Sequence, residues 1–447
     1  MKEVPDSIVC EGCDAVCRRV PLRRREISHC ERCGTELDRH AGGQSARVLP
    51  LTVASLILFA IANLFPIVQI ELQGLTSQTT LAGAVVALSV EGMSPVALLV
   101  LATTILFPLL QLCILFYVLV PLHYERRPAG FAVLVRLLQS LRPWGMVEVF
   151  LLGVLVAIIK LGSIAQVIAG PALWAFVGLT VLLTAILSFN PRTFWELAFE
   201  LPWPGQVPRP TAERRDAAAH PAAPQPVHTA SELGLLSCHH CGTVWQGAAI
   251  GEPCARCSTR LHRRKPDSIN RTWALLLSAA ILYLPANLLP VMITRSLFGI
   301  QQDTILSGVI YFWVSGAYGL AALIFVASFL VPLFKLAALT LLNLLAQRRS
   351  DWRQLERARL YRMLEVIGRW SMLDVFVVAL LAGLVRIQGF AEITAGVGIA
   401  AFGGVVVLTM LASLSFDPRL TWDTREARRR GAGADDEMKT SEEGKNA

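Results

Sequence analysis

The sequence predicts an all-α polytopic membrane protein, built from two parallel repeats of four transmembrane helices, each preceded by a small zinc ribbon. Three observations support this fold class. The 447-residue chain is 54% hydrophobic and only 17% charged, which departs from the composition of ordinary soluble domains. Eight apolar stretches are long enough to cross a hydrocarbon core of about 30 Å. The second half of the chain also repeats motifs of the first half.

The apolar stretches fall into two groups of four, so each group returns the chain to the side of the membrane on which it began. They lie at 48–70, 95–120, 147–167, 171–189, 273–293, 317–342, 371–389 and 395–415. Arginine is concentrated in 121–145 and 346–370, whereas 71–94 contains no Lys or Arg. By the positive-inside rule, we expect the arginine-rich loops, both cysteine clusters and both termini to lie in the cytoplasm.

The internal duplication is visible in three motif pairs. "NLFP" at 63 matches "NLLP" at 287, "WGMVEVF" at 144 matches "WSMLDVF" at 370, and "SFNPR" at 188 matches "SFDPR" at 415. Because the two halves have the same topology, they are parallel repeats, which suggests a site near their interface. The sequence therefore divides into a first ribbon (1–47), a first transmembrane repeat (48–189), a Pro-rich cytoplasmic linker (190–237), a second ribbon (238–265), a second transmembrane repeat (266–416) and a disordered cytoplasmic tail (417–447).

Eight of the ten cysteines form two sets with metal-ligand spacing. Each set has two CxxC pairs, separated by 16 residues in the first set and 12 in the second: Cys10, Cys13, Cys30 and Cys33, then Cys238, Cys241, Cys254 and Cys257. This spacing is typical of zinc ribbons, so we expect two Zn²⁺ ions, one per ribbon. Disulfides conflict with a cytoplasmic location, whereas rubredoxin-like iron competes for the same ligands. Four thiolates leave no open coordination position, which makes the expected role structural.

An intramembrane charge stands out in "LVPLFKLAALTLLN", where Lys335 lies within an apolar run. Asp374 falls at a similar predicted depth on the next span. Since an isolated charge at the bilayer centre costs about 2.5 to 3.5 kcal/mol, we expect the two side chains to be partners. Ser328, Ser371 and Thr409 complete the expected polar network. A purely structural pair that fixes helix register is the alternative interpretation.

The first repeat differs at the matching positions. Gln111 replaces the lysine and Glu148 replaces the aspartate, so the positive partner is missing there. The sequence therefore favours a polar pathway in the second repeat, with Glu148 and Gln111 as a diverged counterpart.

Several classes of activity find no support in the sequence. All eight histidines lie outside the predicted spans, no GxxxxGK[ST] loop is present, and no CxxC pair faces the periplasm. The basic residues follow the expected topology, so no nucleic-acid partner is expected. We find no catalytic constellation and expect the protein not to be an enzyme.

Over roughly residues 8–420, the order of motifs resembles the paraquat-inducible protein A family. In each half, a CxxC ribbon precedes four spans, the first of which closes with "NLFP" or "NLLP", and the second half ends in "SFDPR". The resemblance implies a bacterial inner-membrane protein that works beside an MCE-domain protein forming a periplasm-spanning tunnel. The implied function is to move phospholipid or a similar amphiphile between the inner membrane and that tunnel, in support of envelope integrity.

Two other functions compete with lipid transport. One is a membrane redox or metal-sensing protein whose ribbons bind iron, which metal analysis would identify. The other is a small-molecule exporter that acts alone, for which no periplasmic partner should be found.

Overall fold

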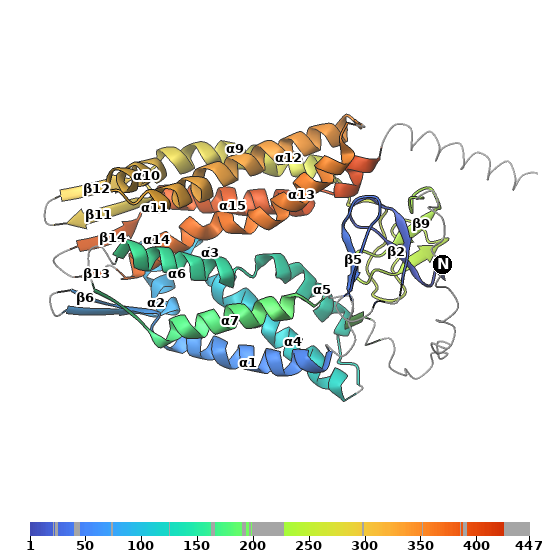
Figure 1. The fold of residues 1–447 in the computed structure, drawn as a ribbon, viewed down its shortest axis with the longest axis horizontal. Helices are drawn as coiled ribbons and strands as arrows, with labels where there is room; N and C mark the ends of the chain where they lie inside the picture. Colours follow the sequence, from blue (N-terminus) through green and yellow to red (C-terminus); the bar gives the residue numbers. More distant parts are fainter. Residues whose placement is uncertain are drawn as a thin grey trace, which may run out of the picture.

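The structure is a computed structural model. It describes residues 1–20, 22, 26–39, 45–72, 75–124, 126–161, 166–189, 194–195, 198, 228–296, 299–350, 352–384, 386–387 and 391–423. The helices of the two repeats run side by side along the long axis (Figure 1). Strands gather at one end of the helices, here called the strand end, and the cysteine-rich segments form the opposite, ribbon end.

Both repeats contain the same elements in the same order, except that the second has one additional strand, β13. The first comprises α1 (Ser45–Leu64), β6 (Val68–Leu72), β7 (Leu75–Thr79), α2 (Leu81–Val90), α3 (Ser94–Leu101), η1 (Ala102–Leu106), α4 (Phe107–His123), α5 (Phe131–Leu141), η2 (Arg142–Trp144), α6 (Val147–Leu161), β8 (Gln166–Ala169) and α7 (Pro171–Leu187). The second comprises α9 (Ser268–Leu288), β11 (Met292–Ser296), β12 (Gly299–Asp303), α10 (Ile305–Val314), α11 (Tyr318–Ile324), η3 (Phe325–Leu330), α12 (Val331–Gln347), α13 (Gln354–Gly368), η4 (Arg369–Met372), α14 (Leu373–Leu384), β13 (Arg386–Ile387), β14 (Ala391–Ala395) and α15 (Val397–Ser415).

Six helical segments of the described chain are long and apolar enough to cross a membrane. They are Arg47–Leu64, Ser94–His123, Phe131–Ile159, Ser268–Leu288, Ala321–Gln347 and Val397–Ser415. The other two predicted spans coincide with shorter helices, α7 of 17 residues and α14 of 12 described residues. A multi-pass membrane protein is therefore confirmed, whereas the predicted count of eight spans remains a prediction.

Each of the two long helices that contain η1 and η3 has a π-helical turn at the matching place, and the sequence explains its position. Pro108 and Pro332 follow these turns, and a proline ring in a helix clashes with the carbonyl of the residue four positions earlier. Those residues are Thr104 and Ser328. The wider π turn relieves the clash and loosens the backbone hydrogen bonding there, a feature that is frequent at functional sites.

The prediction of an all-α fold is wrong at the strand end. Antiparallel strands form a sheet in the order β7-β6-β8 in the first repeat, and β12-β11-β14-β13 in the second. In the first sheet, β6 pairs with β8, a strand that lies far along the chain and was predicted as the end of a span. The pairing satisfies backbone polar groups that would otherwise be left without partners where the helices end.

A repeated glycine joins each sheet to its helices. Gly170 and Gly396 lie at matching positions, and each donates its amide to the residue directly before β6 or β11, at 2.9 Å to the Ile67 oxygen and 2.8 Å to the Val291 oxygen. A Cβ atom at either glycine would lie 2.1 or 2.2 Å from the carbonyl oxygen of the proline in "NLFP" or "NLLP". Only glycine permits this close approach, which accounts for the repeated motif.

We therefore expect Gly396→Ala to destabilise the protein by about 1 to 3 kcal/mol, because the clash is with backbone and cannot be relieved by a rotamer change. The midpoint of thermal unfolding of the purified protein measures the effect. Gly308→Ala, in α10, is the matched control, since a Cβ there meets nothing within 4 Å. Equal midpoints for the two variants would show that the close approach of Gly396 to the Pro290 carbonyl does not limit the stability of the protein.

The two repeats pack through equivalent helices, α6 and α14. Phe150 and Phe376, which match at the spacing of 226, meet edge to face with ring centroids 5.6 Å apart, and Gly153 allows the close approach. Away from this contact the symmetry fails. Helix α2 packs against α14 and buries five side chains, whereas the matching α10 buries only Ile305 and Phe312. One face of the second repeat therefore stays open where its counterpart is covered.

The two ribbons form one unit. They contain β1 (Lys2–Glu3), β2 (Ser7–Val9), β3 (Val16–Arg18), β4 (Ile27–His29), β5 (Glu36–Arg39), β9 (Leu235–Ser237) and β10 (Val244–Gln246). Strand β1 of the first ribbon pairs with β10 of the second, in a sheet of order β1-β10-β9. The ribbons therefore share a sheet, whereas the sequence suggested two separate modules.

Two predicted domain boundaries need correction. Residues 228–237, assigned to the linker, belong to the ribbon unit, because they contain β9 and the Ala230 amide donates to the Asp14 oxygen at 2.8 Å. Residues 417–423, assigned to the disordered tail, include η5 (Pro418–Trp422) with Trp422 buried. Phe194, Trp195 and Ala198 of the predicted linker are also buried. Residues 199–227 and 424–447 lie outside the described residues.

Candidate metal centres and intramembrane polar cluster

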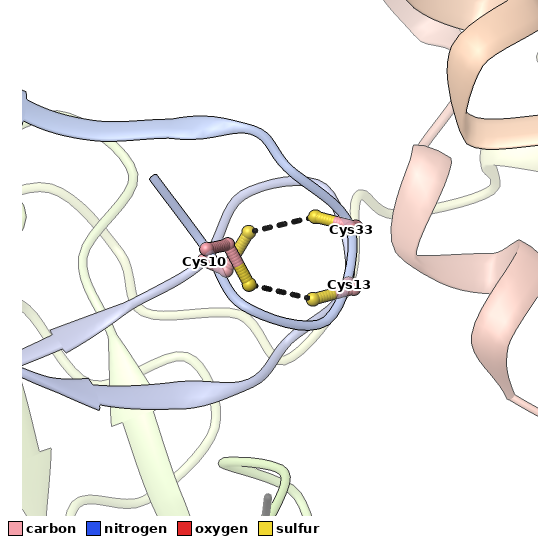
Figure 2. A group of neighbouring side chains, drawn as sticks. Cys10, Cys13 and Cys33 are labelled. Atoms are coloured by element: carbon pink, nitrogen blue, oxygen red, sulfur yellow. Dashed lines mark hydrogen bonds between the residues drawn. The ribbon is translucent and has the colours of Figure 1, made fainter. Parts of the chain in front are cut away.

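The structure brings each predicted set of four cysteines together. Every Sγ of a set lies within 4.8 Å of the others, and all eight cysteines are buried. In the first cluster the Sγ atoms of Cys10 and Cys33 are 3.5 Å apart, as are those of Cys13 and Cys30. Figure 2 shows three of these side chains pointing toward one another. Four thiolates at about 2.3 Å from one ion have such spacings, so each cluster could hold a metal ion.

The second cluster has the same geometry. Its Sγ pairs are Cys238 with Cys257 at 3.3 Å and Cys241 with Cys254 at 3.7 Å. The Trp245 Nε1 donates to the Cys254 Sγ at 3.3 Å, a donor suited to a thiolate. Because every ligand position in a cluster is a cysteine, the donor set suits a thiophilic metal in a closed structural site.

Within each cluster, the contacts between the thiols shift their pKa values in opposite directions. Contacts with neighbouring cysteine thiols, first of all Cys10, raise the pKa of Cys13 well above its ordinary range, whereas contacts with Cys10 and Cys13 lower the pKa of Cys30. The pKa values of Cys238 and Cys254 in the second cluster are raised and lowered in the same way. Ionising all four thiols of a cluster would require a cation between them, and metal binding would release protons.

The two remaining cysteines are not part of these clusters. Cys113 is exposed in α4, and Cys17 lies half-buried in β3 beside the first cluster. Neither residue belongs to a set of four close sulfur atoms, so neither is assigned a ligand role.

Lys335 is among the largest fully buried side chains, with 1% of its surface exposed. Its Nζ donates to the Thr409 Oγ1 at 3.0 Å and to the Gly368 oxygen at 3.5 Å. Both of these partners are neutral acceptors. The lysine therefore does not reach for water at a helix end, and the predicted contact with Thr409 is present.

The other members of the expected network lie close by. Ser328 in η3 and Ser371 in η4 are buried, and neither hydroxyl has a hydrogen-bond partner among the described residues. The two elements pack against each other, which brings both hydroxyls to the interior of the second repeat. Asp374 follows η4 at the start of α14, but its side chain lies outside the described residues. The ion pair of Lys335 with Asp374 thus remains a prediction.

The matching residues of the first repeat form no such cluster. Gln111 is buried against Gly145, with its Nε2 unpaired in the described part of the chain. Glu148 is exposed and accepts a hydrogen bond from the Thr184 Oγ1 at 2.7 Å. The structure does not bring these two predicted residues into the Lys335 cluster.

A charged network at the ribbon end was not anticipated, although "SFDPR" marks it in the sequence. Arg419 binds Asp417 at 3.1 Å, and its Nη2 donates to the His239 Nε2 at 2.6 Å. Burial, with Arg419 adding to it, lowers the pKa of His239 to about 4, so the imidazole is neutral and can accept. Arg264 extends the network by bonding Asp14 of the first ribbon at 3.0 Å. The motif thus anchors the ribbon unit to the end of α15.

With this geometry established, comparison with known proteins identifies the family. The sequence profile of the paraquat-inducible protein A family matches residues 45–198 and again residues 269–426, which together make up well over half of the chain. The chain belongs to the paraquat-inducible protein A family. The double match coincides with the two repeats of the structure, so each repeat by itself resembles the family profile.

Three relatives in the family cover nearly the whole chain. The "Intermembrane transport protein PqiA" of Escherichia coli (strain K12) is 35% identical over 93% of this chain and 95% of its own length. The "Lipophilic envelope-spanning tunnel protein A" of the same organism is 30% identical over 94% of this chain and 91% of its own length. The "Probable intermembrane transport protein" of Haemophilus influenzae is 28% identical over 92% of this chain and 95% of its own length. No solved structure matches the chain significantly.

Proposed function

We propose that the protein is an inner-membrane component of a lipid transport system, which moves phospholipid or a similar amphiphile between the inner membrane and a periplasm-spanning partner. The observation that carries this proposal is the 35% identity, over 93% of the chain, to a protein named for intermembrane transport. A second relative, named as an envelope-spanning tunnel protein, supports a lipophilic cargo and a tunnel. These relatives are named as a transport protein and a tunnel protein, which supports a non-enzymatic role.

The partner is an MCE-domain tunnel protein on the periplasmic side. In this arrangement the strand end faces the periplasm, and the ribbon end and both termini face the cytoplasm, as the positive-inside rule favours. Apolar side chains that are exposed at the strand end, including Ile300 and Trp313, support a docking or lipid-handling role there.

Zinc is the ion that best suits the two cysteine clusters. The eight buried cysteines would hold two Zn²⁺ ions, which would supply folding energy to ribbons too small to be stable alone. The competing redox function requires iron in the same ligand set.

The buried cluster of Lys335, Thr409, Ser328 and Ser371 is the transport-linked polar site. Among the described residues the ammonium is held by neutral acceptors, a costly arrangement in the membrane interior, so a functional role would explain its presence better than a contribution to stability does. We infer that alternating exposure of a cavity near this cluster lets Lys335 respond to protonation or to a lipid headgroup, with Asp374 as its expected partner.

Site-specific photo-crosslinking in intact cells tests the proposed orientation and partner. Probes that replace Ile300 in β12 or Trp313 in α10 should capture an MCE-domain protein, identified by mass spectrometry. A probe at Trp352, which is equally exposed but lies near the ribbon end, should not. Absence of the MCE-domain protein at the first two positions, or equal capture at Trp352, would contradict the tunnel proposal. Phospholipid that co-purifies with the captured complex would identify the cargo.

A further inference from the structure

The docking of the ribbons onto the membrane helices follows an unexpected pattern. Helices α5 and α13 are equivalent elements of the two repeats, and both lie at the ribbon end (Figure 1). Arg136 of α5 and Arg362 of α13 occupy matching positions, at the same spacing of 226 that relates the neighbouring motifs. Each arginine contacts a ribbon, but not the ribbon that precedes its own repeat.

The first ribbon docks on the second repeat. Arg362 donates from Nη2 to the Cys33 oxygen at 2.8 Å and from Nη1 to the Gly34 oxygen at 3.0 Å. Both acceptors belong to the loop between β4 and β5, which carries two of the four cysteines of the cluster, Cys30 and Cys33. Ala358, one turn earlier on α13, is buried in the core of this ribbon, and Arg32 covers the ring of Trp422 at 4.6 Å. The contact therefore combines apolar burial with two charge-assisted hydrogen bonds.

The second ribbon docks on the first repeat through the matching arginine, here with a side-chain hydroxyl as the acceptor. Arg136 donates to the Thr259 Oγ1 at 3.4 Å, and Thr259 matches Thr35 in the loop of the first cluster. Gln139, one turn along α5, makes two contacts with His240, from Nε2 to the backbone oxygen at 3.0 Å and between Oε1 and Nδ1 at 3.0 Å. The two docking contacts are thus related by the pseudo-symmetry of the repeats. They are crossed, because the first ribbon contacts the second repeat and the second ribbon contacts the first.

The crossed docking ties the two halves of the molecule together. Because β1 and β10 join the ribbons into one sheet, a displacement of either ribbon affects both repeats. In the second repeat, the docked helix α13 also contacts the buried Lys335. Helix α13 ends at Gly368, whose carbonyl accepts from Lys335. Arg362 and Gly368 lie on the same short helix, less than two turns apart.

We propose that the joined ribbons are a crossed clasp, in which Arg136 and Arg362 fasten each ribbon to the repeat that it does not precede. In this clasp, metal loading of the first cluster shapes the loop onto which Arg362 docks. Arg362 is a positioning residue, since it holds the helix whose last carbonyl accepts from Lys335. The first ribbon thereby couples a cytoplasmic metal site to the intramembrane polar cluster.

Hydrogen exchange of the purified full-length protein tests the clasp without requiring a transport assay. In Arg362→Gln, exchange of the amides in 362–372 should be at least about tenfold faster than in the unaltered protein, because two hydrogen bonds of an ionised group are lost. Metal content, measured by mass spectrometry, should stay at two ions. Arg359→Gln is the matched control, since Arg359 is an exposed arginine on the same helix. Arg136→Gln should accelerate exchange in α5 and leave 362–372 unchanged.

The second part of the experiment repeats the hydrogen-exchange measurement after a chelator has removed the metal. Removal of the metal should accelerate exchange in 362–372 of the unaltered protein but add little to Arg362→Gln, because both changes release the same contact. Equal acceleration in the two proteins would show that the metal acts on α13 by another route and would overturn the coupling. An effect of Arg359→Gln as large as that of Arg362→Gln, or slow exchange in Arg362→Gln, would overturn the clasp itself. Neither result depends on lipid transport, so failure of the proposed function leaves this test intact.

Discussion

Replacing Cys238 and Cys241 together with serine is expected to remove one of the two metal ions and to lower the abundance of the protein several-fold. The two residues supply half of the thiolates of the second cluster, and metal binding to a structural site of this kind is worth about 10 to 16 kcal/mol at neutral pH. That ribbon also shares the β1–β10 pairing with the first ribbon. Loss of its metal should therefore loosen the whole ribbon end.

Quantitative immunoblotting of membranes and metal analysis of the purified protein measure the two effects. Cys113→Ser is the matched control, because Cys113 is exposed and is not part of either cluster. It should retain both ions and full abundance. If the double variant is as abundant as the control but selectively loses transport, the second ribbon acts directly in function, and the structural role proposed here is wrong. Iron found in place of zinc would favour the redox alternative.

The features that the sequence predicted correctly are those that depend on local patterns. A CxxC pair holds its two ligands within four residues, so the metal clusters could be recognised without knowing the fold. The apolar stretches that became α1 or α15 are likewise a property of a single segment. The repeat also follows from the sequence, and the structure assigns roles to it, such as the approach of Gly396 to Pro290.

The features that were missed depend on contacts between distant residues. Strand β6 pairs with β8 across almost the whole first repeat, and the five residues of β6 carry too little pattern to predict that partner. Arg362 bonds the Cys33 carbonyl over 329 positions of sequence, and a backbone acceptor leaves no mark in a sequence. The order in 417–423 was missed for a related reason, because Trp422 and Arg419 are fixed by the ribbon unit rather than by their neighbours.

The Lys335 cluster illustrates both limits. A lysine in an apolar run predicts an intramembrane polar site, and the contact with Thr409 was anticipated. The Gly368 carbonyl was not anticipated, because a backbone oxygen of α13 becomes available only when that helix ends beside α12. It is this unpredicted contact that connects the polar cluster to the ribbon end.

Replacing Lys335 with methionine is expected to abolish most transport, by at least about tenfold, while the protein still inserts and folds. Methionine nearly preserves the buried volume and removes an ammonium that, among the described residues, is held by two neutral acceptors, a costly arrangement in the membrane interior. Alanine would leave a cavity, because the lysine side chain is fully buried, and would mix a packing defect with the loss of charge. A thermal unfolding midpoint equal to or above that of the unaltered protein would show that neutral acceptors alone hold the ammonium, whereas a lower midpoint would indicate the ion pair with Asp374.

Transport is measured by the envelope barrier of cells that lack the native gene, and by transfer of phospholipid to the partner in vitro. Thr409→Val is the graded control, since it removes one acceptor but retains the ammonium and should lose less activity. The double variant Lys335→Asp with Asp374→Lys, which swaps the two charges, distinguishes a structural role of the pair from a functional one. A register-fixing pair should tolerate the reversal, because the attraction persists. A site that presents an ammonium to a phosphate or to a proton path should not, because the positive charge then sits on α14 and away from Thr409. Normal transport in the exchanged protein, or in Lys335→Met, would assign this lysine to helix register alone.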